Sequence, residues 1–224
     1  MTTCHIVAAG DFFPERFAPR AGDGVYAADA GLRHLDALGA APDMIFGDFD
    51  SLGAPPEREN VRVCPVRKND TDTMVALKYA LERGYNRILL HGGTGGERFD
   101  HTLANLQALV YAARRGAQAF LLGENFTATA LCGGALRFAG YAGNLTVLCV
   151  GETAVGVGET GVSYPLRNAV LTPDFPLGVS NSFEGERAEI SLERGDLLLC
   201  WQGNLTRPLP EMTRPDKSGH ERTE

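Results

Sequence analysis

Short apolar segments alternate with helix-like segments over roughly the first 130 residues, and this alternation restricts the fold more than any other feature of the sequence. The apolar segments end near a glycine or an aspartate, and stretches with helical spacing of leucine lie between them. A chain in which strands and helices alternate forms a mostly parallel sheet with helices on both faces. The expected strands cover residues 5–9, 25–28, 43–46, 61–66, 87–91 and 118–122.

The helix expected between the last two of these strands begins at about His101 and ends at Gly116. Leu103, Leu106 and Val110 recur at helical spacing, so we expect them to form its buried face.

The pattern changes at Gly133, after which short β-rich runs are separated by glycines and no helical period is evident. Such a pattern is typical of a β-sandwich or barrel. We therefore expect a Rossmann-like α/β domain over residues 1–132 and an all-β domain over residues 133–206. Residues 207–224 are charged, contain proline and lack an apolar period, so we expect them to be disordered.

Composition excludes several classes of protein. No apolar run is long enough to cross a bilayer, and the first residues lack the features of a signal peptide, so a cytoplasmic protein is expected. The net charge of −7 argues against nucleic-acid binding and favours a cationic or metal-bridged small substrate. Five cysteines without a close pair predict buried thiols, not a disulfide framework or a zinc site.

Acidic residues follow most of the predicted strands. Because the carboxyl ends of parallel strands meet at one edge of a sheet, these carboxylates should converge where α/β proteins bind ligands. Asp48 and Asp50, with one residue between them, could grip one divalent cation, although turn capping is an alternative role for this pair. A magnesium ion with a polyphosphate would relieve the repulsion within the whole set, which comprises Asp11, Asp29, Asp48, Asp50, Asp70, Asp72 and Asp100.

A glycine-rich segment, residues 92–96, precedes Arg98. Glycines let a backbone approach phosphates closely, and a guanidinium suits phosphoryl oxygens, although many such loops only connect a strand to a helix. His101 and Asn105 lie one helical turn apart and so face the same way. For His101 alone, a structural hydrogen bond is favoured over acid–base catalysis.

These motifs together resemble the thiamine pyrophosphokinase (thiamine diphosphokinase) family, from the first strand to about Trp201. The resemblance rests on Ala28–Gly31, Gly47–Ser51, Lys68–Asp72, Gly92–His101 with Leu103–Asn105, Gly161–Leu166 and Gly178–Phe183.

The resemblance implies an enzyme that transfers the diphosphoryl group of ATP to the hydroxyl of thiamine, with magnesium as cofactor and AMP as the other product. It also implies a C-terminal β-sandwich and a homodimer. In such a dimer the acidic edge of one chain would be joined by Tyr164, Ser180 and Asn181 of the other.

The resemblance also implies roles for particular residues. Asp48, Asp50 and Asp72 would hold the metal, Arg98 would stabilise phosphoryl charge, and Asp100 or Asp72 would orient or deprotonate the hydroxyl. The expected nucleotide contacts come from Asp29, Thr71, Gly95, His101 and Asn105, and the expected thiamine contacts from Tyr164, Ser180 and Asn181.

Two positions depart from the family pattern. Asn69 replaces a common aspartate, and Tyr164 stands where some members have a tryptophan that stacks on thiamine. Instead of stacking on thiamine, Tyr164 could be a strand residue that packs within the β domain. Two other functions stay open at this point: a metal-dependent nucleotide phosphohydrolase, and a nucleotide-binding sensor with a degenerate site.

Overall fold

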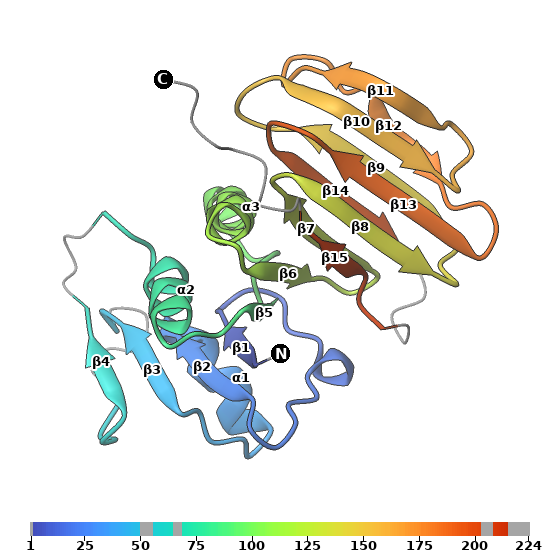
Figure 1. Cartoon of the computed structure of the whole chain (residues 1–224). Coiled ribbons are helices and arrows are strands. Elements are labelled where there is room, and N and C mark those ends of the chain that lie inside the picture. Colours follow the sequence, from blue (N-terminus) through green and yellow to red (C-terminus); the bar gives the residue numbers. More distant parts are fainter. Residues whose placement is uncertain (1, 50–55, 65–68, 203–207, 215–224) are drawn as a thin grey trace. The chain divides into compact units, whose positions relative to one another are not determined.

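The structure is a computed structural model that describes residues 2–49, 56–64, 69–202 and 208–214 (Figure 1). The chain divides into two compact units, Met1–Ala130 and Leu131–Glu224. The sequence placed this boundary after residue 132.

The first unit is built on a mostly parallel sheet, as the sequence predicts. Its strands follow the order β7-β6-β5-β1-β2-β3-β4, and all neighbours are parallel except β6 and β7. The carboxyl ends of the parallel strands therefore share one edge. The strands are β1 (Thr3–Val7), β2 (Gly24–Ala28), β3 (Met44–Gly47), β4 (Val61–Val63), β5 (Arg87–His91), β6 (Gln118–Leu122) and β7 (Phe126–Leu131).

Helices cover both faces of this sheet. Val7 and Val25 pack with Leu35 of α1 (Leu32–Ala37) in one buried cluster. Ile6, which points to the opposite face because side chains alternate along a strand, lies with residues of α2 (Asp72–Glu82) and α3 (Phe99–Arg114). Single 3₁₀ turns occur at Pro14–Arg16 and Asp29–Gly31. Among the described helices, none combines the length and apolar character that a membrane span requires.

The buried face of α3 differs from the one that the leucine spacing predicts. The helix begins two residues early, at Phe99, and Leu103 is 48% exposed. Leu106 and Val110 are only half-buried. Small side chains let a helix approach a sheet closely, so the alanine-rich face turns inward and the larger residues flank it. The buried residues are Asn105, Ala108, Leu109 and Ala112.

The second unit consists of antiparallel strands, as the sequence predicts. In one group β9 lies between β12 and β14, and the other group follows the order β11-β10-β13-β8-β15. The fully buried rings of Phe138 in β8 and Trp201 in β14 meet edge to face, with centroids 5.2 Å apart. The strands are β8 (Gly134–Ala139), β9 (Asn144–Cys149), β10 (Ala154–Thr160), β11 (Leu166–Leu171), β12 (Gly178–Ser182), β13 (Arg187–Leu192), β14 (Leu197–Gln202) and β15 (Glu211–Thr213).

The expectation that residues 207–224 are disordered is wrong for part of that range. Residues Glu211–Thr213 form β15 and pair with β8, and the hydroxyl of Tyr141 donates to the carbonyl of Pro208 at 2.7 Å. Local composition could not reveal this pairing, because the hydrogen bonds come from a strand more than 70 residues away in the sequence. Residues 207 and 215–224 lie outside the described part of the chain.

Candidate active site

A pocket of about 240 Å³ lies in the first unit at the carboxyl ends of β1, β2 and β5. Loops that follow these three strands form most of its wall, and the starts of α2 and α3 complete it. The lining comprises Ala8–Gly10, Ala28, Asp29, Thr71–Thr73, Gly92–Arg98, His101, Thr102 and Asn105.

The loops after β1 and β5 lie backbone against backbone. Gly10 N–H donates to the Gly92 carbonyl at 2.8 Å, and Asp11 N–H donates to the Thr94 carbonyl at 2.7 Å. A Cβ atom at Gly10 would lie 2.2 Å from the Thr94 carbonyl oxygen, and one at Gly92 would lie 2.1 Å from that of Ala8. Side chains at these positions would force the loops apart. The pocket therefore keeps a wall made largely of main chain.

Asn105 fixes the glycine-rich loop from the helix side. Its buried amide nitrogen donates to the carbonyl of Gly93 at 2.8 Å. Asn105 was predicted as a nucleotide contact, and the structure places it in the pocket lining with its amide engaged on the loop. His101 and Gly95, two further predicted contacts, also line the pocket.

The start of α2 forms a second wall. The Thr71 hydroxyl accepts a hydrogen bond from the Met74 N–H at 3.2 Å and so caps the helix. Asp72 is the first helical residue and lines the pocket with Thr71. The neighbouring Asp70 instead binds Lys78, whose ammonium nitrogen lies 2.7 and 2.8 Å from the two carboxylate oxygens.

Asp29 is a lining residue of this pocket that has one unsatisfied carboxylate oxygen. It follows β2 with a positive φ of 48°, a conformation that Asp tolerates better than most residues. Its Oδ1 atom is buried and has no hydrogen-bond partner within the described part of the chain. Buried polar atoms are nearly always paired, so this oxygen is suited to a cation or a donor supplied by a ligand.

Arg98 and Asp100 form an exposed two-pronged ion pair. Nε and Nη2 of Arg98 donate to the two oxygens of Asp100 at 2.9 and 2.7 Å. The hydrogen bond from Arg98 is the main cause that lowers the pKa of Asp100 to about 2. Arg98 lines the pocket, whereas Asp100 lies outside its lining. An ionised, paired carboxylate is a weak proton acceptor, so Asp100 is a poor candidate for the general base.

Asp48 and Asp50, the other predicted metal ligands, differ in what the structure describes. Asp48 is half-buried after β3 and lies outside the lining, and Asp50 is beyond the described residues. Within the described ranges, no three His, Cys, Asp or Glu side chains are grouped as a metal site. Asp29 and Asp72, together with Glu97, are the carboxylates of the lining.

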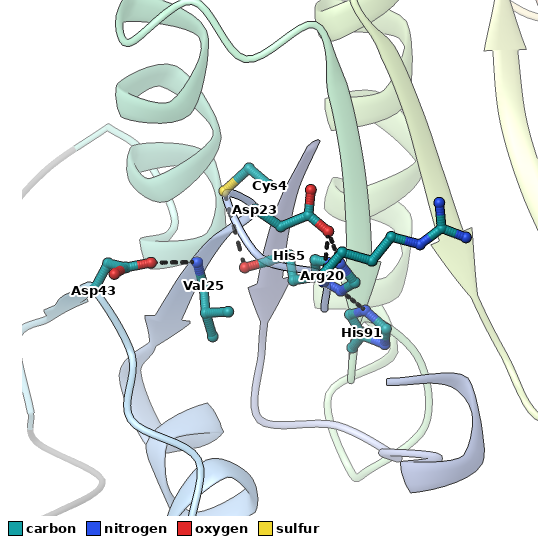
Figure 2. Close-up of polar contacts among 7 residues, drawn as sticks. All are labelled: Cys4, His5, Arg20, Asp23, Val25, Asp43 and His91. Carbon is teal, nitrogen blue, oxygen red and sulfur yellow. Dashed lines mark hydrogen bonds and ion pairs between the residues drawn. The ribbon is translucent and has the colours of Figure 1, made fainter. Parts of the chain in front are cut away.

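A buried pair of histidines, His5 of β1 and His91 of β5, was not predicted (Figure 2). His5 Nδ1 and His91 Nε2 are 3.1 Å apart, and His5 Nε2 lies 3.6 Å from Asp23 Oδ2. Burial lowers the pKa of both imidazoles, and Asp23 opposes this shift for His5. His91 ends β5 and directly precedes Gly92, so the pair supports the base of the loop. Histidine within an otherwise apolar strand was the only signal for it in the sequence.

The predicted thiamine contacts lie in the second unit. Tyr164 is 72% exposed, and Ser180 is also exposed, with a positive φ of 63°. Asn181, in contrast, is only 5% exposed, and its amide is engaged by the main chain of Tyr164.

Each unit matches the model of a known domain. The model of the thiamin pyrophosphokinase catalytic domain matches residues 21–121, and that of the thiamin pyrophosphokinase vitamin B1 binding domain matches residues 138–197. The chain belongs to the thiamine pyrophosphokinase family. Thiamine pyrophosphokinase of Bacillus subtilis (strain 168) is 29% identical over 179 residues, which cover 76% of this chain and 83% of that protein.

Solved structures of the family have the same fold. Thiamin pyrophosphokinase from Geobacillus thermodenitrificans matches with a TM-score of 0.78 and 28% identity, over 91% of this chain and 98% of the other. The Bacillus subtilis enzyme matches with a TM-score of 0.77 and 26% identity, over 90% and 99%. The Candida albicans enzyme, at 14% identity and a TM-score of 0.72 over 91% and 89%, shows likeness of fold alone.

Proposed function

We propose that this protein is an ATP- and magnesium-dependent thiamine diphosphokinase, which transfers the diphosphoryl group of ATP to the hydroxyl of thiamine and releases AMP. The observation that carries the proposal is the pocket of the first unit, whose lining combines a wall of main chain, two helix starts and Asp29, a residue with an unpaired carboxylate oxygen.

The wall of this pocket suits a polyphosphate. The N-terminal ends of α2 and α3 carry partial positive charge, which favours anions. The glycine-rich loop adds main-chain donors, and its glycines have no side chain that would keep a phosphate away. Asp29, Thr71, Gly95 and His101 would surround the nucleotide, and Asn105 would hold the loop in place.

The same pocket suits a magnesium ion. Magnesium is commonly bound through one or two carboxylates together with phosphates of the substrate, and Asp29 and Asp72 supply two in the lining. The unpaired Oδ1 of Asp29 is a hard oxygen donor that would gain a partner. Asp48 and Asp50 remain predicted ligands from the sequence. Bound magnesium would neutralise phosphate charge as the diphosphoryl group is transferred.

Arg98 is the residue that we assign to phosphoryl charge. Its bonds to Asp100 use Nε and Nη2, so the N–H groups on Nη1 remain outside this ion pair and could bind a phosphoryl oxygen. Asp100 would then hold the guanidinium in orientation. Asp72, which lines the pocket, is the better candidate to orient the attacking hydroxyl or accept its proton.

Thiamine recognition is assigned to the second unit, within the residues that the vitamin B1 binding model matches. Its exposed Tyr164 offers an aromatic face, which attracts a cation such as the thiazolium ring. Ser180, also exposed, would add a hydroxyl contact.

We further propose that the active unit is a homodimer, with a Rossmann-like first domain and a β-sandwich as the second. Exposed large apolar residues in one region of the second unit's sequence support an interface there. They are Tyr164, Val170, Phe175, Leu177 and Val179. A cytoplasmic location remains a prediction from the sequence.

One incubation of the purified protein with thiamine, ATP and magnesium tests the proposed function. Separation of the products should show thiamine diphosphate and AMP in equal amounts, and both should depend on thiamine. AMP or ADP formed without thiamine would instead identify a phosphohydrolase, and ATP binding without turnover would identify a sensor.

A further inference from the structure

Tyr164 is exposed to solvent, and the side chain of Asn181 forms hydrogen bonds with both its main-chain N–H and its main-chain carbonyl. The Oδ1 atom of Asn181 accepts from the Tyr164 N–H at 2.9 Å, and its Nδ2 atom donates to the Tyr164 carbonyl at 2.9 Å. Oδ1 also accepts from the Ser182 N–H at 2.9 Å, and this pattern fixes which end of the amide is oxygen. Because Pro165 follows, Tyr164 is also restricted to extended conformations.

The remaining N–H of the Asn181 amide donates to Glu159. Glu159 lies on β10 with no exposed surface, and its Oε2 atom accepts from Asn181 Nδ2 at 2.8 Å. Its other oxygen, Oε1, is buried without a hydrogen-bond partner in the described part of the chain. Burial raises the pKa of Glu159 to about 7. A carboxyl group at this position costs stability compared with an apolar side chain of similar size.

We infer that Glu159 is a positioning residue for thiamine recognition: it orients the Asn181 amide, which fixes the main chain of Tyr164 and so the direction of the exposed ring. This inference rests on the proposed function in one respect, the assignment of Tyr164 to thiamine. An Asn amide can rotate about its last side-chain bond, and the bond to Glu159 holds the orientation that serves both Tyr164 groups. This role accounts for a costly buried carboxyl group in the protein interior.

The first test measures order at Tyr164 and needs no activity. Amide hydrogen exchange would be followed by NMR in the full-length protein and its variants. Glu159→Met removes the acceptor at similar volume, and Glu159→Asp withdraws it by one methylene. Both should speed exchange of the Tyr164 N–H by about three- to tenfold, as expected from the loss of one hydrogen bond. Glu159→Gln retains an acceptor and should leave exchange near the wild-type rate.

The second test asks whether the effect reaches thiamine. In Glu159→Met and Glu159→Asp, KM for thiamine should rise by about three- to tenfold, while KM for ATP changes by less than about twofold. Glu159→Gln should keep KM for thiamine near the wild-type value. The matched control is Glu189→Gln, which alters a carboxylate of β13 that pairs with Arg137 and is 40% exposed. It should change neither constant.

The outcomes separate this inference from the proposed function. Absence of diphosphokinase activity in the wild-type protein would refute the function, yet the exchange experiment would still test the support of Tyr164. Unchanged exchange at Tyr164 in both acceptor-removing variants would overturn the inference, as would equal effects on the two KM values. If Glu159→Met fails to fold, Glu159→Asp carries both measurements.

Discussion

At the scale of single residues, Arg98 and Asp100 form one ion pair, although the sequence analysis gave each of them a separate role. Their ion pair is exposed, with 68% of the Arg98 side chain and 64% of the Asp100 side chain accessible. Solvent therefore screens it, and it contributes little to folding stability. Its geometry has a clearer consequence, because the planar carboxylate sets the plane of the guanidinium next to the pocket.

We predict that Arg98→Lys lowers kcat/KM for ATP by about tenfold or more, because an ammonium group cannot bind Asp100 and a phosphoryl group in one plane. Asp100→Asn should lower it less and should leave the shape of the pH profile unchanged between about pH 5 and pH 8. The reason is that the pKa of Asp100, about 2, lies below this range. Disappearance of an acidic limb in Asp100→Asn would identify Asp100 as the base.

The buried histidines lead to a second prediction about single residues, which concerns the stability of the fold at acidic pH. The pKa of His91 lies below its ordinary value of 6.5 because the ring is buried. Below pH 6.5 the unfolded chain takes up a proton that the folded chain does not, so the free energy of unfolding falls as the pH falls.

His91→Gln should therefore weaken the pH dependence of the urea midpoint between about pH 7.5 and pH 5, although the variant itself loses about 1 to 3 kcal/mol at neutral pH. His101→Gln, which changes an exposed histidine, is the matched control and should keep the wild-type slope. An unchanged slope in His91→Gln would show that other groups determine the acid response.

The residue types at the site could be read from the sequence, but not their partners. Asp29 and Asp72 were predicted on the basis of strand ends, and Thr71 from the family resemblance. All three line one pocket, as expected when parallel strands end at one edge. Asp70 follows the same pattern, yet it binds Lys78, which lies two helical turns further along. Such pairings depend on side-chain geometry that spacing alone does not determine.

At the scale of elements, strands were predicted better than helix faces. Most strands of the parallel sheet contain a short apolar run, which can be recognised in the sequence. The inner face of α3 was predicted from Leu103, Leu106 and Val110. The face that is buried instead includes Ala108 and Ala112, and Leu103 is 48% exposed. The same limit applies to β15, whose three residues have no strand-like pattern of their own.

We predict that two truncations of the C-terminus differ in effect. Removing residues 215–224 should leave Tm unchanged, because this segment is charged and has little apolar surface. Removing residues 208–224 also removes β15 and the acceptor of the Tyr141 hydroxyl, and it should lower Tm by several degrees, or roughly 1–3 kcal/mol. Tyr141→Phe isolates the contribution of the hydroxyl. Equal Tm values for the two truncations would show that β15 does not stabilise the second unit.

At the scale of the whole molecule, the chemistry is divided between two compact units. The first holds the features that suit phosphates and metal, and the second holds the exposed aromatic residue that suits the thiamine rings. In the described part of the chain, the pocket that we assign to the nucleotide lies in the first unit and the residues that we assign to thiamine lie in the second. The family resemblance assigns the two halves of one site to different chains of a homodimer, and this assignment can be tested without a structure of the dimer.

We predict that inactive chains complement each other when their defects lie in different units. Asp72→Asn and Tyr164→Ala chains, each nearly inactive alone, should recover about one quarter of wild-type activity after random subunit exchange. The reason is that half of the dimers are mixed and each mixed dimer regenerates one intact site.

The matched control mixes Asp72→Asn with Asp29→Asn, both of which alter the pocket of the first unit. Here every site in a mixed dimer keeps one defect, so activity should not return. Mass spectrometry of the intact dimers would verify exchange in both mixtures. If verified mixed dimers of Asp72→Asn and Tyr164→Ala remain inactive, each chain must contain its own complete site.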